Sequence, residues 1–272
     1  MDYKTIFELM RAKNCIIASI AVLIAYLIQN FAITAELGLA MLSVFLICGA
    51  GQAINDVFDA KIDAKINKDK PIPSKRITKK QASIFSSALF IIGVSLTLLI
   101  NPLTFVIALV FSILLVLYAS VLYKVKYIGN FVVALGTAFT FIFGAAASGS
   151  IGMLIIIFAI SAFFANMARE ITKDFEDIKK DKGFKKTLPM ISRKAASVVV
   201  IVYHLLAVTF AMIAYMFYLD YNFVYFVIIV LSSLAFGQSI KLLLNNNYNK
   251  AQKKCKKGMI FSLIAFASTI IK

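Results

Sequence analysis

Two short stretches of this chain carry aspartates at the same spacing, i, i+3 and i+7. These residues are Asp56, Asp59 and Asp63 in the first stretch, and Asp174, Asp177 and Asp181 in the second. At about 100° per residue, this spacing places three carboxylates on one face of a helix. Carboxylates stacked in this way repel one another and raise each other's pKa unless a cation lies between them. The spacing therefore indicates two cation-binding clusters.

The ligand type favours Mg²⁺ as the cation. Oxygen ligands alone suit a hard ion, either Mg²⁺ or Ca²⁺, and Mg²⁺ usually takes one or two carboxylates together with waters and substrate phosphates. Asn55 directly precedes the first cluster, and lysines and arginines surround both clusters. Basic side chains neutralise the phosphate charge that a metal leaves uncompensated. We therefore predict a phosphate-handling Mg²⁺ site with the six aspartates as its ligands.

The composition is that of a membrane protein. The chain has 272 residues, 61% of them apolar, and a mean hydropathy of +0.88, yet its net charge is +16. The high apolar content and the high net charge are compatible if the charged residues are confined to loops between membrane spans. No stretch joins basic residues to a soluble recognition fold, so nucleic acid is not an expected partner. Cys15, Cys48 and Cys255 lie far apart and His204 is the sole histidine, which does not support a zinc site.

Nine apolar segments predict an all-α polytopic bundle of nine transmembrane helices, with residues 1–272 as one domain. Most of the segments approach the ~20 residues that cross ~30 Å of hydrocarbon. The last is the shortest and could instead be tilted or interfacial. The segments are 14–33, 37–54, 82–100, 103–122, 128–148, 151–168, 195–219, 221–240 and 258–271.

Charge placement predicts the orientation. With the N-terminus inside, all of the 29 lysines and arginines except Lys272 fall on the cytoplasmic side. Both clusters then lie on the cytoplasmic face of a cell membrane, each after an even-numbered span. This repetition suggests two duplicated halves around one central cavity, with the inner loops at about 58–80 and 175–194 as cytoplasmic caps.

The expected substrate joins a diphosphate to an apolar tail, as a polyprenyl diphosphate does. Mg²⁺ and lysines would stabilise the leaving diphosphate, and a helix-lined cavity would shield the allyl cation from water. A transporter or cation channel could also use these acids, although they cluster at one face instead of the midplane. A CDP-alcohol phosphotransferase is disfavoured because its Asp-Gly and Ala-Arg motif is absent.

The motifs resemble those of the UbiA superfamily of intramembrane prenyltransferases, over nearly the whole chain. Asn55-Asp56-x-x-Asp59-x-x-x-Asp63 is similar to the family's first motif. Asp174-x-x-Asp177-x-x-x-Asp181, followed by Thr187-Leu188-Pro189, is similar to its second. The stretch from Tyr118 through Lys124 to Gly129-Asn130 resembles its loop between the fourth and fifth spans. The resemblance implies a Mg²⁺-dependent prenyl transfer.

Within that superfamily, the chain most resembles the archaeal ether-lipid enzymes. The supporting residues are Arg11-x-x-Asn14-Cys15, Pro71-Ile72-Pro73-Ser74-x-Arg76-Ile77 and Asn166-x-x-Arg169-Glu170-x-x-Lys173-Asp174. This likeness implies transfer from geranylgeranyl diphosphate to the glycerol hydroxyl of geranylgeranylglyceryl phosphate, among membrane lipids and without an obligate protein partner. An aromatic acceptor such as 4-hydroxybenzoate is the alternative within the same fold.

The resemblance also implies residue roles. Asp56, Asp59, Asp174 and Asp177 would be catalytic by holding Mg²⁺–diphosphate, with Asp181 as a further ligand and Asn55 and Asp63 in support. The expected substrate-binding residues are Asn55, Asp63, Arg76, Lys124, Lys173, Arg11 and Asn14. Of these, Arg76 and Lys124 would bind diphosphate oxygens and Arg11 the acceptor's phosphate. The chain departs from the family at Lys75 and Lys180, where members commonly have Gly, and at Lys70, where they have Arg.

Overall fold

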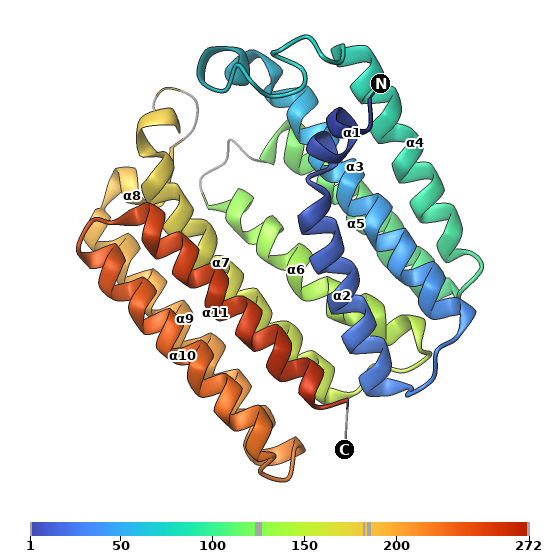
Figure 1. Cartoon of the computed structure of the whole chain (residues 1–272), viewed down its shortest axis with the longest axis vertical. Helices are drawn as coiled ribbons and strands as arrows, with labels where there is room; N and C mark the ends of the chain where they lie inside the picture. The colour runs from blue at the N-terminus through green and yellow to red at the C-terminus, as the bar shows by residue number, and fades with distance from the viewer. Residues whose placement is uncertain (1, 123–126, 182, 184–185, 271–272) are drawn as a thin grey trace. The chain divides into compact units, whose positions relative to one another are not determined.

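The structure, a computed structural model, describes residues 2–122, 127–181, 183 and 186–270. Every regular element in these ranges is helical, as the sequence predicts. The helices gather into two compact units (Figure 1). The first unit comprises Met1–Leu122 and Phe143–Ser150, and the second comprises Tyr123–Ile142 and Ile151–Lys272. Each aspartate cluster belongs to a different unit.

The first unit is built around one long helix, α3, which packs against the other four helices of its N-terminal segment. The last turn of α6 completes the unit. The helices are α1 (Tyr3–Met10), α2 (Ala12–Gln29), α3 (Ala35–Ile66), α4 (Lys79–Thr97), α5 (Pro102–Ser120) and α6 (Ile128–Ala147). At about 1.5 Å per residue, the 32 residues of α3 extend roughly 48 Å, well beyond the hydrocarbon thickness of a bilayer. One end of α3 can therefore stand clear of the membrane.

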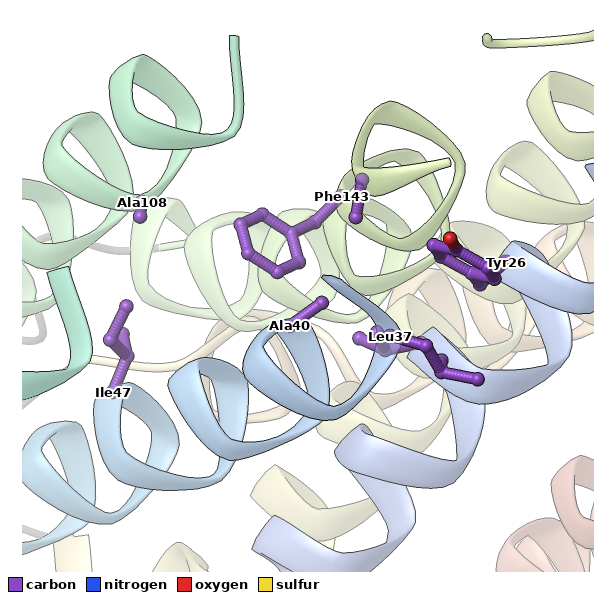
Figure 2. Close-up of a cluster of buried hydrophobic side chains, with 8 residues drawn as sticks. Tyr26, Leu37, Ala40, Ile47, Ala108 and Phe143 are labelled. Carbon is purple, nitrogen blue, oxygen red and sulfur yellow. The ribbon is translucent and has the colours of Figure 1, made fainter. Parts of the chain in front are cut away.

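Small residues let the helices of this unit approach closely around the side chain of Phe143. Figure 2 shows the ring of Phe143 above Ala40 of α3, pointing toward Ala108 of α5. Gly144 of α6 lies against the backbone of α2, where a Cβ would be 2.5 Å from the carbonyl oxygen of Val22. These contacts bury the apolar faces of α2, α3, α5 and α6 in one core.

The starts of the helices follow from the local sequence. Asn101 caps α5 by accepting a hydrogen bond from the backbone of Thr104, and Pro102 occupies the first helical turn. Thr78 and Gln81 form a reciprocal capping box at the start of α4. These caps fix where the chain re-enters helix after each loop.

The second unit contains a long helix, α7, which packs against α9 and α11, while α10 packs against α9 and α11. These helices are α7 (Met153–Asp181), α8 (Leu188–Ile191), α9 (Arg193–Tyr218), α10 (Phe223–Leu244) and α11 (Tyr248–Ser268). The Phe158 and Phe266 rings stack 3.9 Å apart in its interior. His204 is buried and hydrogen-bonds through Nδ1 to the Val200 carbonyl, so it belongs to the core of this unit.

Eight helices in the described ranges are long and apolar enough to cross a membrane, and the chain is a multi-pass membrane protein. They coincide with the first eight predicted spans. Residues 258–268 of the predicted ninth segment, 258–271, form the second half of α11. This helix begins ten residues earlier and carries five lysines in its first half. The inner loops are shorter than predicted because α3 and α7 stay helical through both aspartate stretches, where alanine and lysine favour helix.

Candidate active site

The first aspartate cluster occupies the last three turns of α3. Asp56 and Asp63 are each only 4% exposed, and Asn55 donates a hydrogen bond of 2.9 Å to Asp59. The Nζ of Lys70 lies 3.0 Å from Asp56 Oδ1 and 2.7 Å from Asp63 Oδ2. One ammonium group therefore bridges two carboxylates of the cluster, which satisfies the need for a cation between them.

Arg11 supplies a second cation to the same cluster from the junction of α1 and α2. Its backbone adopts the left-handed conformation, with φ of 49°, and its N–H closes α1 by donating to the Glu8 carbonyl. The guanidinium then reaches Asp56 at 2.8 Å and the side-chain oxygen of Gln52 at 2.6 Å. A non-glycine residue in this conformation is uncommon, so the turn places a specific side chain at the cluster. The exposed Asn14 follows one turn later in α2.

The loop after α3 is held down by apolar and polar contacts. Ile72 and Ile77 pack with Leu9 and Val57 in a small core shared by α1, α3 and α4. The hydroxyl of Ser74 donates to the carbonyl of Lys70 at 2.7 Å. These contacts explain why the Pro71-Ile72-Pro73-Ser74 element stands beside the cluster: it fixes the backbone from which the Lys70 side chain extends.

Arg76 fastens the same loop to α1. Its two terminal nitrogens donate to both carboxylate oxygens of Glu8, at 2.6 and 3.0 Å, and its Nε donates to the Ser74 hydroxyl. The hydrogen bonds from Arg76 hold the pKa of Glu8 below its usual value. Such a two-pronged pair is geometrically specific. The expected diphosphate-binding role of Arg76 therefore stays a prediction, beside a structural role that its contacts establish.

The second cluster lies near the end of α7, where an amide on α6 contacts Asp174. Asp174 is 5% exposed and accepts a hydrogen bond of 2.7 Å from Asn130 of α6. Two turns earlier on α7, Asn166 donates to the Val133 carbonyl and the Thr137 hydroxyl of α6. Two asparagines thus fix the register of α7 against the part of α6 in this unit.

The structure describes some of the remaining predicted residues of this region and not others. Asp177 and Lys173 lie half-buried on α7, on the turn that holds Asp174. Asp181 ends the helix, but its side chain and the whole of Lys124 lie outside the described residues. Thr187, after the second cluster, is 4% exposed, and its hydroxyl lacks a hydrogen-bond partner in the described part of the chain. A buried donor of this kind can bind a ligand oxygen at no cost to an internal bond.

The donor chemistry of both clusters fits Mg²⁺, although neither forms a closed metal cage. Within the described ranges, no three His, Cys, Asp or Glu side chains are grouped so as to hold a metal ion by themselves. Each cluster offers carboxylate and amide oxygens, which are hard ligands. Mg²⁺ needs only one or two carboxylates when waters and phosphates complete its shell. The residues therefore suit a metal that arrives with a phosphate.

Three contact residues were not among the predicted site residues. Gln52 lies one turn before Asp56 on the same helical face, so the helical period could have found it. Asn130 stands at the end of the stretch that resembles the family's loop between the fourth and fifth spans. Glu8 carried no signal, because its pairing with Arg76 joins residues 68 positions apart.

The family model that describes the UbiA prenyltransferase family matches residues 15–264. The chain belongs to the UbiA prenyltransferase family. As a member it is a prenyltransferase, which confirms the class of enzyme that the paired motifs indicate.

Relatives of this UbiA family member carry a more specific name. Digeranylgeranylglyceryl phosphate synthase of Methanococcus maripaludis (strain C7) is 40% identical over 264 residues, which cover 95% of this chain and 94% of the relative. A solved chain from work on a digeranylgeranylglyceryl phosphate synthase in membranes superimposes with a TM-score of 0.82 at 34% identity, over 98% of each chain.

A more distant solved structure shares the fold. It is a UbiA homolog from Archaeoglobus fulgidus, bound to DMAPP and Mg²⁺, with a TM-score of 0.73 at 16% identity. The superposition covers 96% of this chain and 99% of that one. At this identity the likeness extends to the fold alone.

Proposed function

We propose that this chain transfers the geranylgeranyl group of geranylgeranyl diphosphate to the free glycerol hydroxyl of geranylgeranylglyceryl phosphate. The product would carry the second ether bond of an archaeal membrane lipid. The observation that carries this proposal is the 40% identity to a digeranylgeranylglyceryl phosphate synthase over 95% of the chain. Both aspartate motifs lie within the matched family region, residues 15–264.

We further propose that the two clusters bind the diphosphate of the donor together with Mg²⁺. The ligands would be Asp56, Asp59 and Asp63 of the first cluster and Asp174, Asp177 and Asp181 of the second. Mg²⁺ would supply positive charge that stabilises the leaving diphosphate. Support comes from the oxygen-only donor sets and from the Archaeoglobus fulgidus homolog that was solved with Mg²⁺.

The neighbouring residues would orient these carboxylates and bind the substrates. Asn55 holds Asp59 and Asn130 holds Asp174 by hydrogen bonds. Lys124, Lys173 and Arg76 would neutralise diphosphate oxygens. On the acceptor side, Arg11 and Asn14 would bind the phosphate of geranylgeranylglyceryl phosphate.

The reaction would exchange one C–O bond for another. The bond between C1 of the prenyl chain and its oxygen breaks, and the diphosphate leaves with the electron pair. The glycerol oxygen of the acceptor then forms a bond to C1 and loses its proton. Electrostatic stabilisation of the leaving group is where the basic residues contribute most, since negative charge develops there.

The finer architecture remains part of the proposal. We infer a ninth span in the apolar half of α11, a single domain with two duplicated halves around a central cavity, and a cytoplasmic N-terminus and active site. The confinement of all but one Lys and Arg to one set of loops supports the orientation. The equal spacing of the two aspartate clusters supports the duplication.

The direct test is a transfer assay in detergent with geranylgeranyl diphosphate and geranylgeranylglyceryl phosphate, with and without Mg²⁺. We expect Mg²⁺-dependent product, and a loss of at least about 100-fold in Asp59→Ala and Asp177→Ala. Asp69→Ala is the matched control, because Asp69 is an exposed acid in the loop after α3. Turnover only with an aromatic acceptor would refute the lipid substrate, and no turnover with any acceptor would refute the transferase.

A further inference from the structure

A pocket of about 220 Å³ opens in the second unit where three helices begin or end. Its walls come from the first turns of α9, the last turn of α10 and the residues that lead into α11. Leu243 and Phe175 are buried at this pocket, being 2% and 3% exposed. Phe175 is adjacent in sequence to Asp174, but successive side chains on a helix point about 100° apart. The pocket therefore lies on a different face of α7 from the Asp174–Asn130 contact.

The rim of this pocket is positively charged. Arg193 and Lys194, the first two residues of α9, line it, and both are exposed. Neither forms an ion pair with any acid in the described ranges. Because they begin a 26-residue helix, the positive end of the helix dipole adds to their field. An anion at this rim would meet two uncommitted cations.

The remaining wall of the pocket is apolar and continues along α9. Val198 and Leu244 line the pocket and remain 51% and 56% exposed. Val202 and Leu205 follow Val198 at i+4 and i+7, and both are exposed as well. This spacing forms one stripe on a helix that is long and apolar enough to span a membrane. The charged rim is thus joined to an apolar track suited to a lipid chain.

The helix that starts at the pocket extends the positive surface. Tyr248 lines the pocket as the first residue of α11, and Lys250, Lys253, Lys256 and Lys257 follow on that helix with exposed side chains. Clusters of four or more basic residues next to a membrane-spanning helix attract anionic lipid. The charge near the pocket therefore favours an anionic headgroup over a zwitterionic one.

We propose that this pocket binds the phosphate headgroup of an anionic membrane lipid, whose chain lies along Val198, Val202 and Leu205. Arg193 and Lys194 neutralise the negative charge of the headgroup, as arginine and lysine side chains generally do for phosphates at a membrane surface. The residues that line this pocket are not those of the aspartate clusters, and the site does not depend on the acceptor that the enzyme uses.

The test compares lipid binding to delipidated full-length protein by native mass spectrometry, with phosphatidylglycerol and phosphatidylcholine as probes. We expect preferential retention of phosphatidylglycerol, weakened about tenfold or more in the double variant Arg193→Gln/Lys194→Gln. Lys79→Gln/Lys80→Gln is the matched control, since these exposed lysines are the first two residues of α4 and do not line this pocket. Equal weakening in both double variants would mean unspecific surface charge and would overturn the proposal.

A second variant tests the chain-binding track without removing charge. Val198→Trp fills the apolar side of the pocket and, because Val198 is half-exposed, leaves the core of the unit intact. We expect weaker phosphatidylglycerol binding, with an unchanged elution volume in size-exclusion chromatography. Unchanged binding in Val198→Trp, or displacement of the lipid by millimolar inorganic phosphate, would identify a simple anion site and overturn the assignment to a lipid.

Discussion

The two aspartate clusters share a spacing but differ in the contacts that hold them. In the first, Lys70 and Arg11 contact the carboxylates of Asp56 and Asp63 as charged donors. In the second, the neutral amide of Asn130 donates a hydrogen bond to Asp174. A charged donor competes with a metal for the same oxygen, whereas an amide can hold one oxygen and leave the other for a ligand. The same motif can therefore be preorganised in two ways.

This difference has a consequence for the first cluster. Lys70 lies between two buried carboxylates, which is the position that a cation must take to relieve their repulsion. Binding of Mg²⁺ to Asp56 or Asp63 would therefore weaken a contact of Lys70. In the second cluster, the hydrogen bond from Asn130 orients the Asp174 carboxylate for a ligand.

Among the variants that change how the aspartates are held, we expect the largest effect from removing that amide. Asn130→Ala should lower prenyl transfer by about 10- to 100-fold, because an orienting hydrogen bond to a metal-binding carboxylate is lost. The measurement is kcat/KM for the donor across Mg²⁺ concentrations, with the variant requiring more Mg²⁺. Asn249→Ala is the matched control, since Asn249 also donates to an acid of α7, Glu176, at an exposed position. Equal losses in the two variants would contradict the orienting role of Asn130.

The sequence was sufficient for the features that depend on local pattern. The i, i+3, i+7 spacing placed each cluster on a helix, and the apolar runs matched eight long helices. Helical period, capping and hydropathy each act over a few residues or one span, so they can be read from a single sequence.

Features that depend on how loops and helix ends pack could not be predicted in this way. The Lys70 bridge exists because Ile72 and Ile77 anchor the loop against α1, α3 and α4. The pocket beside Arg193 forms from the ends of helices that are distant in sequence. The early start of α11 was also missed, since its first ten residues are too basic to read as a span.

A smaller effect should follow from removing the cation of the first cluster. Lys70→Met leaves Asp63 without its cation and Asp56 with Arg11 alone, so the apparent melting temperature without metal should fall by roughly 5 °C. Addition of Mg²⁺ should then stabilise this variant more than the wild type, because the metal replaces the lost charge. The measurement is thermal unfolding in detergent with and without Mg²⁺.

Lys68→Met provides the control for Lys70→Met. Lys68 is exposed in the same loop and has no polar contact to other described residues. Its loss should therefore leave the melting temperature unchanged, both with and without Mg²⁺. A Mg²⁺-induced shift in Lys70→Met no larger than that of the wild type would mean that metal and ammonium do not share the site. Lys70 would then have no bearing on how the first cluster binds metal.

The smallest effect distinguishes the loops that follow the two clusters. Lys75 has φ of 63° in the first loop, whereas Gly183 has φ of 88° in the second. A side chain in this conformation is strained by roughly 1 kcal/mol, and glycine is not. Lys75→Gly should therefore stabilise the protein by about 0.5–1 kcal/mol, and Gly183→Ala should destabilise it by a similar amount. Thermal unfolding of both variants measures this, and shifts of the same sign would contradict it. Opposite signs would show that the first loop keeps a strained residue where the second loop has the residue that fits this conformation.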